Sequence, residues 1–66
     1  RLGDFKKAIS DWTGAIGLDS KIIPHYLDRA KAKKELGDLK GACEDWKKAA
    51  ELGDEDAAKL LEEHCK

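Results

Sequence analysis

Trp12 and Trp46 are the residues of this sequence whose chemistry most readily suggests a ligand. An indole ring can stack on a nucleic-acid base or form part of a cage around a cation. Each Trp, however, lies in the middle of a run of apolar residues spaced three and four apart, which is one face of a helix. We therefore expect both rings to pack between neighbouring helices, and we expect Trp46→Ala to unfold the chain.

Cys43, Cys65 and His64 are the residues that could bind a metal ion. His64 and Cys65 are adjacent, and adjacent side chains on a helix point about 100° apart, so they cannot hold one ion from the same face. Neither a C-x-x-C nor an H-x-x-x-H spacing occurs. The sequence therefore predicts no metal site. We expect two free thiols that act as small hydrophobic side chains, which is typical of a reducing compartment.

No group of residues in the sequence supports catalysis. His25 lies beside Pro24 without a nearby nucleophile, and the run Glu62-Glu63-His64 lacks the Glu-x-x-His spacing of di-iron bundles. A glycine-rich phosphate loop is also missing. We expect neither enzyme activity nor a cofactor.

The length and the charge balance restrict the kinds of partner. Thirteen Lys and Arg against fourteen Asp and Glu give a net charge of -1 over 66 residues, which lacks the basic excess of a nucleic-acid-binding protein. No apolar run approaches the ~20 residues that span a bilayer. We expect one small cytoplasmic helical domain that binds neither nucleic acid nor membrane. Because the sequence starts at Arg1 without a leader, we expect it to be cut from a longer one.

An internal repeat organises the elements that position these residues. When the sequence is compared with itself after a shift of 34 residues, ten of 32 positions are identical, against about three expected from the composition. Nine of the ten fall in one block: Leu2/Leu36, Gly3/Gly37, Asp4/Asp38, Lys6/Lys40, Ala8/Ala42, Asp11/Asp45, Trp12/Trp46, Ala15/Ala49 and Leu18/Leu52. The tenth is Leu27/Leu61.

The repeated block predicts a helix in both copies. Gly3 and Gly37 are expected to end a preceding helix, and Asp4 and Asp38 to cap the next one. Apolar residues then recur at helical spacing. In the first copy they are Phe5, Ala8, Ile9, Trp12, Ala15 and Ile16; in the second they are Leu39, Ala42, Cys43, Trp46, Ala49 and Ala50.

Two further helices are predicted beside the two copies. The helix between them has Asp19 and Ser20 as candidate caps and Pro24 in its first turn. Gly53 ends the second copy, and Asp54 is expected to cap a last helix. The turns are short, so helices that follow one another are expected to be antiparallel.

The repeat resembles the tetratricopeptide repeat, which has a 34-residue period. The resemblance is carried by Tyr26, Ala30, Leu36-Gly37-Asp38, Ala42, Trp46 and Ala49. Residues 46–54 are also similar to Sel1-like repeats. The resemblance implies an all-α fold in which antiparallel helix-turn-helix repeats form a right-handed α-solenoid. Residues 1–22 would be the second helix of a truncated repeat, residues 23–53 a complete repeat and residues 54–66 a C-terminal capping helix.

The same resemblance implies a function, because tetratricopeptide arrays bind peptides in a concave groove lined by the first helix of each repeat. We expect a protein–protein interaction scaffold that binds a peptide or helix of a partner protein. The candidate groove residues are Leu27, Lys31, Lys34, Glu35, Leu61 and Cys65. The alternative is a purely structural C-terminal cap of a longer solenoid, without a direct ligand.

Two surfaces of the predicted helices have a less specific interpretation. Arg29 and Lys33 depart from the family pattern, which usually has Leu and an aromatic residue there. Together with Lys31 and Lys34 they spread around one helix, and we expect a solvated surface. The face between Phe5 and Trp12 is expected to be partly uncovered, which would permit weak self-association.

Overall fold

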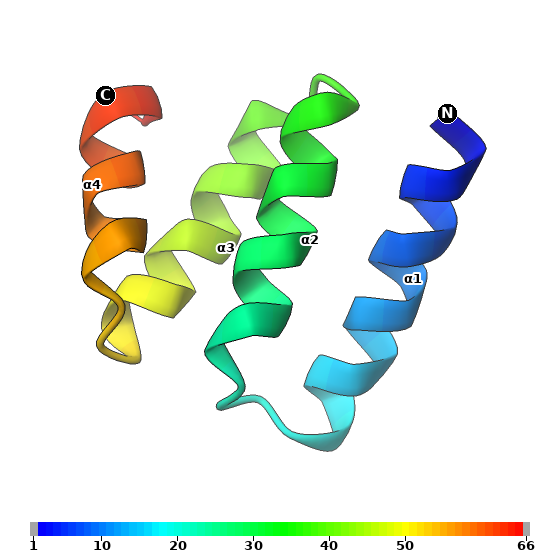
Figure 1. Ribbon diagram of the computed structural model, residues 1–66, viewed down its shortest axis with the longest axis horizontal. Helices are drawn as coiled ribbons and strands as arrows, with labels where there is room; N and C mark the ends of the chain where they lie inside the picture. The colour runs from blue at the N-terminus through cyan, green and yellow to red at the C-terminus, as the bar shows by residue number, and fades with distance from the viewer. Residues whose placement is uncertain (1, 66) are drawn as a thin grey trace.

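The computed structural model describes residues 2–65 and contains four helices (Figure 1). They are α1 (Leu2–Leu18), α2 (Ile23–Glu35), α3 (Leu39–Glu51) and α4 (Glu55–His64). The described part of the chain has no strand, so the all-α class is confirmed. The first predicted segment begins at Arg1 and the last one ends at Lys66, and these two residues lie outside the described part of the chain.

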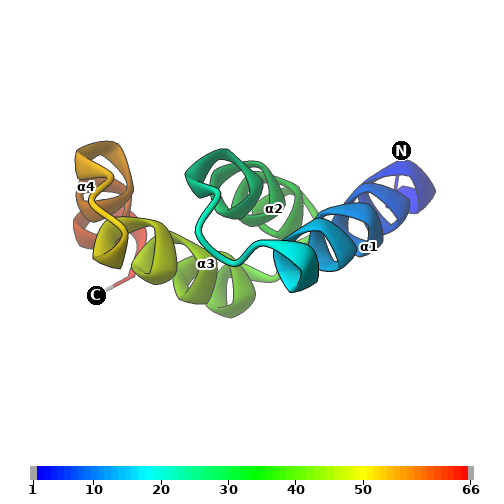
Figure 2. The same ribbon diagram turned by 90° about the horizontal axis from the view of Figure 1, so that it is seen from below.

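Each helix packs mainly against its neighbours in the sequence: α1 against α2, α2 against α3, and α3 against α4. Successive helices run in opposite directions, as the short turns predicted (Figure 1). In the perpendicular view, α2 and α4 lie on the same side of α3 (Figure 2). The result is a thin body of 28 × 26 × 13 Å in which α1 and α4 are the outermost helices.

The two turns that flank α3 confirm the predicted helix ends. Gly37 and Gly53 adopt φ values of 86° and 110°, a left-handed conformation that glycine tolerates best. Asp38 accepts a hydrogen bond from the Gly41 amide at 3.0 Å. Two residues after the start of α4, Ala57 donates its amide to the Asp54 carboxylate at 2.7 Å. Each carboxylate satisfies an amide of a first helical turn.

The prediction that Gly3 and Asp4 form the same turn is wrong, because α1 runs through both residues. In the turn after α2, Gly37 and Asp38 donate their amides to the carbonyl groups of Lys34 and Lys33. The corresponding carbonyl groups would come from positions before Arg1, outside this sequence. Leu2-Gly3-Asp4 instead forms the first turn of α1.

Asp19 and Ser20 do not cap α2, which is a second correction. The cap position is Ile22, which makes no side-chain cap hydrogen bond, and Pro24 lies in the first turn as predicted. The Asp19 carboxylate instead accepts from the Lys21 amide at 3.0 Å. Ser20 accepts a hydrogen bond at its carbonyl oxygen from the Tyr26 hydroxyl at 2.7 Å. These two bonds order the α1–α2 loop.

The core is built where α2, α3 and α4 meet, and most of its residues are small. Its buried members are Tyr26, Ala30, Ala42, Trp46, Ala49 and Ala57. The four alanines let the helix backbones approach closely around the two aromatic rings. Trp46 is 3% exposed, so its prediction as a core residue is confirmed, whereas Trp12 is only half-buried.

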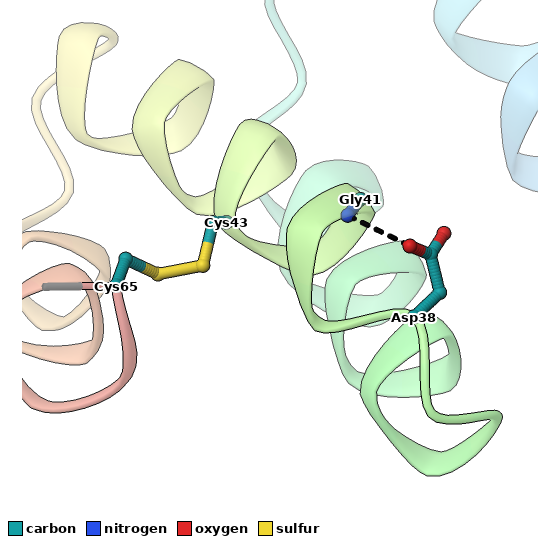
Figure 3. The surroundings of a disulfide bond; sticks show 4 residues. All are labelled: Asp38, Gly41, Cys43 and Cys65. Atoms are coloured by element: carbon teal, nitrogen blue, oxygen red, sulfur yellow. Dashed lines mark hydrogen bonds between the residues drawn. A yellow bond between two sulfur atoms is a disulfide. The ribbon is translucent and has the colours of Figure 1, made fainter.

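The prediction of two free thiols is wrong, because Cys43 and Cys65 form a disulfide (Figure 3). Cys43 lies near the start of α3, and Cys65 directly follows α4. The antiparallel packing of α3 and α4 brings their Cα atoms to 5.9 Å, within the span of a disulfide. The two apolar stripes that carry the cysteines thus face each other. A disulfide is typical of an oxidising environment, so the thiol argument for a reducing compartment no longer holds.

Candidate functional site

An ion pair joins α2 to α3. The Arg29 guanidinium donates two hydrogen bonds to the Asp45 carboxylate, from Nε at 2.8 Å and from Nη2 at 2.6 Å. Lys33 places its Nζ 3.4 Å from the same carboxylate. Asp45 is 3% exposed. A buried carboxylate requires such partners, because an unpaired charge in the interior is strongly unfavourable.

The Arg29 guanidinium also contacts two other groups. It donates to the Thr13 hydroxyl of α1 at 3.1 Å and lies 5.8 Å from the centre of the Tyr26 ring. The hydrogen bond with Asp45 raises the pKa of Arg29 above its usual value, against the opposing effect of burial. The side chain therefore stays charged and connects α1, α2 and α3.

A groove lies between α2 and α4, with α3 as its floor, and has a volume of about 340 Å³. Its lining residues are Leu27, Asp28, Lys31, Lys34, Trp46, Asp56 and Leu60. We call it the α2–α4 groove. Its volume is at the small end of the range of about 300–1,000 Å³ for ligand pockets, which suits an anchoring side chain of a peptide.

Charge is distributed unevenly along the α2–α4 groove. α2 and α4 run in the same direction (Figure 1). Asp28 lies nearer the start of α2 than the two groove lysines, and Asp56 lies at the start of α4. Lys31 and Lys34 follow towards the end of α2. All four charged residues are exposed, whereas Leu27 and Leu60 are half-buried beside Trp46. The groove thus combines an apolar centre, formed by Leu27, Leu60 and Trp46, with two acidic residues beside it and two basic residues further towards the end of α2.

A second hollow, of about 540 Å³, lies between α1 and α2. Phe5 and Trp12 of α1 form one side of it. The residues from α2 are Asp28, Lys31, Ala32 and Glu35. We call it the α1–α2 cleft. Asp28 and Lys31 line both hollows, so the exposed face of α2 is shared between them.

The structure brings together some of the six predicted groove residues and separates others. Leu27, Lys31 and Lys34 line the α2–α4 groove, and Glu35 lies in the α1–α2 cleft. Leu61 packs against the core, and Cys65 is bonded to Cys43. The disulfide turns this side of α4 towards α3.

Two groove residues of α4 were not predicted, although their spacing in the sequence indicates that they share a helix face. Asp56 and Leu60 line the groove in place of Leu61 and Cys65. They lie four residues apart, the spacing of side chains on one helix face. Choosing between the Leu60 and Leu61 faces requires the rotation of α4 about its axis, which the disulfide to Cys43 reveals.

The basic cluster on α2 divides into two pairs. Lys31 and Lys34 are exposed, as expected of a solvated surface. Arg29 and Lys33 are half-buried and approach Asp45, so the solvated interpretation is wrong for these two. Both residues depart from the tetratricopeptide pattern that the sequence resembles, and this departure could have indicated that they differ from Lys31 and Lys34.

His64 lies against Trp46 rather than beside a metal-binding group. The two rings stack with their centres 5.4 Å apart and their planes 30° apart. Within residues 2–65, no cluster of three or more His, Cys, Asp or Glu side chains could hold a metal ion. No helix in the same range is long and apolar enough to cross a membrane.

Comparisons of this chain with protein-family models, with curated proteins and with solved structures found no match.

Proposed function

We propose that this chain is a protein-interaction module that binds a peptide segment of another protein in the α2–α4 groove. The observation that carries the proposal is the lining of that groove. Leu27, Leu60 and Trp46 provide an apolar centre, Asp28 and Asp56 lie beside it, and Lys31 and Lys34 follow towards the end of α2. Such a lining has a place for one apolar side chain and for flanking charges, as in helix and peptide recognition.

The charge order of the groove specifies the peptide. A basic residue would contact Asp28 and Asp56, an apolar residue would enter the centre, and an acidic residue would contact Lys31 and Lys34. Opposite charges favour association and fix the direction of the bound segment. The expected ligand therefore has a basic and an apolar residue close together, followed by an acidic residue in the direction from the start to the end of α2.

We propose the architecture to be that of a right-handed α-solenoid of the tetratricopeptide type. The 34-residue repeat and the antiparallel helix order support this assignment. The position of α2 and α4 on one side of α3 supports it as well. In such an architecture the α2–α4 groove belongs to the surface formed by the first helices of successive repeats.

A display library of random twelve-residue peptides tests the proposed function. Peptides selected on the wild-type chain should share a basic and an apolar residue close together and an acidic residue to one side of them. They should lose binding to the Leu60→Lys variant, because a charge then enters the apolar centre. Ala58→Lys is the matched control, since Ala58 is an exposed residue of the same helix and does not line the groove.

Circular dichroism should show that both variants keep their helices. If the library yields no binders, or if the binders tolerate Leu60→Lys as well as Ala58→Lys, the groove is not a peptide site. The second candidate, a structural cap, would then be favoured. The disulfide and the Trp46–His64 stack support that candidate, because they fix α4 on α3.

A further inference from the structure

One face of α1 is incompletely covered. Ala8, Asp11, Trp12 and Ala15 form this face, and we call it the α1 face. Asp11 is exposed, and the other three residues are only half-buried. Within the described residues α1 is an outermost helix that packs mainly against α2 (Figure 1).

The same four residue types form a fully covered face on α3. Ala42, Asp45, Trp46 and Ala49 match the α1 face position by position, and none of the four is more than 3% exposed. The difference lies in the neighbours, because α3 packs against both α2 and α4.

The cover of α3 on its α2 side has a defined chemistry. Tyr26 and Ala30 pack into the core with Trp46. Arg29 and Lys33 neutralise Asp45. On α2 these four residues are spaced as aromatic-x-x-Arg-Ala-x-x-Lys.

From this correspondence we infer that the α1 face binds an amphipathic helix from outside these 66 residues with the pattern aromatic-x-x-Arg-Ala-x-x-Lys. The Arg and Lys of that helix pair with Asp11, and its aromatic residue and Ala pack on Trp12, Ala8 and Ala15. Asp11 forms no ion pair with any residue in the range 2–65, so its charge is available. This inference concerns a different surface from the α2–α4 groove and does not depend on the proposed function.

The α1–α2 cleft provides room for the incoming helix. Its floor includes Trp12, and α2 forms one wall. The α2–α4 groove, by comparison, has Trp46 as its floor and a wall on each side. A helix placed on the α1 face would complete the cleft, as α2 completes the groove around Trp46.

A second copy of this chain is a poorer occupant. The pattern it could offer is that of its own α2, whose Tyr26 and Ala30 are already packed against Trp46 and whose Arg29 is bonded to Asp45. Presenting that side of α2 to another molecule would require removing it from α3 and leaving Asp45 buried without partners. We therefore assign the face to a helix from outside these 66 residues rather than to a second copy of them.

A synthetic peptide with the sequence of residues 20–36 is the probe that tests this inference. A lactam bridge on the side that faces away from α3 in the protein should preform its helix, because a free peptide of this length is only marginally helical. Added to the ¹⁵N-labelled chain, it should shift the amide signals of Ala8, Asp11 and Ala15 and the indole N–H signal of Trp12.

Variants of Asp11 show whether the charge pair forms. Asp11→Asn should weaken binding of the peptide about tenfold, the size expected of a charge-assisted hydrogen bond. Asp11→Lys should abolish it, and a peptide with Glu in place of Arg29 should restore binding to Asp11→Lys. Glu44→Gln is the matched control, because Glu44 is an exposed carboxylate of α3.

Three kinds of result would overturn the inference. The first is the lack of any shift at millimolar peptide. The second is a set of shifts confined to the α2–α4 groove, or binding that is equal for wild type and Asp11→Asn. The third is a set of concentration-dependent shifts of the α1 face without peptide, together with a dimer in sedimentation, which would assign the face to a second copy of the chain.

Discussion

α1 and α3 carry the same Ala, Asp, Trp and Ala at matching positions, yet α3 buries all four and α1 leaves its Asp in water. The comparison shows that the residues of one helix do not by themselves determine how deeply they are buried. Asp45 is an interior carboxylate because Arg29 and Lys33 reach it from α2. Asp11 is likewise followed by a Trp and has an Ala on either side of it on the same helix face. Within the described structure, however, no cation pairs with it.

Replacing each Trp by Ala tests the largest difference between α1 and α3. Trp46→Ala should lower the free energy of unfolding by about 3–5 kcal/mol, because it empties the centre of the core. Trp12→Ala should lower it by about 1–2 kcal/mol, since the Trp12 ring is already half in water. Urea denaturation followed by circular dichroism measures both.

A loss of 3–5 kcal/mol is a large part of the stability of so small a domain. Trp46→Phe and Trp12→Phe therefore provide a milder pair that keeps both variants folded. Equal losses within either pair would contradict the distinction between a core Trp and an edge Trp.

Removing the disulfide tests the covalent difference, since α4 is bonded to α3 and no such bond joins α1 to α2. The bond links residues 22 apart in sequence. The double variant Cys43→Ser/Cys65→Ser should be less stable by about 3 kcal/mol, the size expected for a loop of this length. Thermal unfolding with and without a reducing agent measures the same quantity on the wild type.

The local effect of removing the disulfide distinguishes the two ends of the molecule. Amide protection should fall first in α4, where Leu60 and Leu61 would retain only packing against α3. A fall that begins in α1 would show that the disulfide supports the whole body rather than one end.

The two aspartates test the electrostatic difference. Asp45→Asn should lower the free energy of unfolding by about 2 kcal/mol, because it removes a charged acceptor from Arg29 and Lys33. Asp11→Asn should change it by less than about 0.5 kcal/mol, as exposed positions usually do. Guanidinium would screen the pair, so urea is the denaturant to use.

The pH dependence of the Arg29 contribution follows from the direction of its shift. The pKa of Arg29 is raised in the folded state by the hydrogen bond to Asp45. Its contribution is therefore complete below the unfolded pKa and lost only as the pH rises through the higher folded pKa. The difference in stability between wild type and Asp45→Asn should thus stay constant from neutral pH to about pH 10. A difference that disappears over that range would contradict the pairing.

Two glycines give the smallest expected difference. Gly14 lies inside α1 with open space around it, so Gly14→Ala should raise the free energy of unfolding by about 0.5–1 kcal/mol. In α3, a Cβ on Gly41 would meet the capping carboxylate of Asp38 (Figure 3) and come within 3.0 Å of the Lys33 side chain. Gly41→Ala should therefore lower stability by about 1 kcal/mol, the usual effect of losing an N-cap. A gain from both substitutions would show that the cap adjusts freely.

The sequence was sufficient to predict those features that depend on local signals. Gly37 with Asp38, and Gly53 with Asp54, combine a left-handed glycine with a capping carboxylate, and both ends formed as predicted. Pro24 likewise marked the first turn of α2. These signals act within one turn of the chain, so no neighbouring helix is needed to interpret them.

Features that depend on two helices at once could not be predicted in this way. Leu2-Gly3-Asp4 repeats the turn motif of Leu36-Gly37-Asp38 but forms helix, so the motif alone does not determine its structure. The Cys43–Cys65 disulfide and the choice of Leu60 over Leu61 depend on how α4 is rotated against α3. Apolar periodicity identifies a buried face to within about one residue, which is too coarse to choose between adjacent side chains.

The packing of each helix mainly against its sequence neighbours has a kinetic consequence. Contacts between residues close in the chain form with little loss of loop entropy, and helical domains of this kind fold in microseconds to milliseconds. The disulfide joins only α3 and α4, and the Arg29–Asp45 pair holds α2 on α3, so α1 can open and reclose while the other three helices stay packed. Such end-opening would make α1 the first segment to exchange its amide hydrogens with solvent, well before the chain unfolds as a whole.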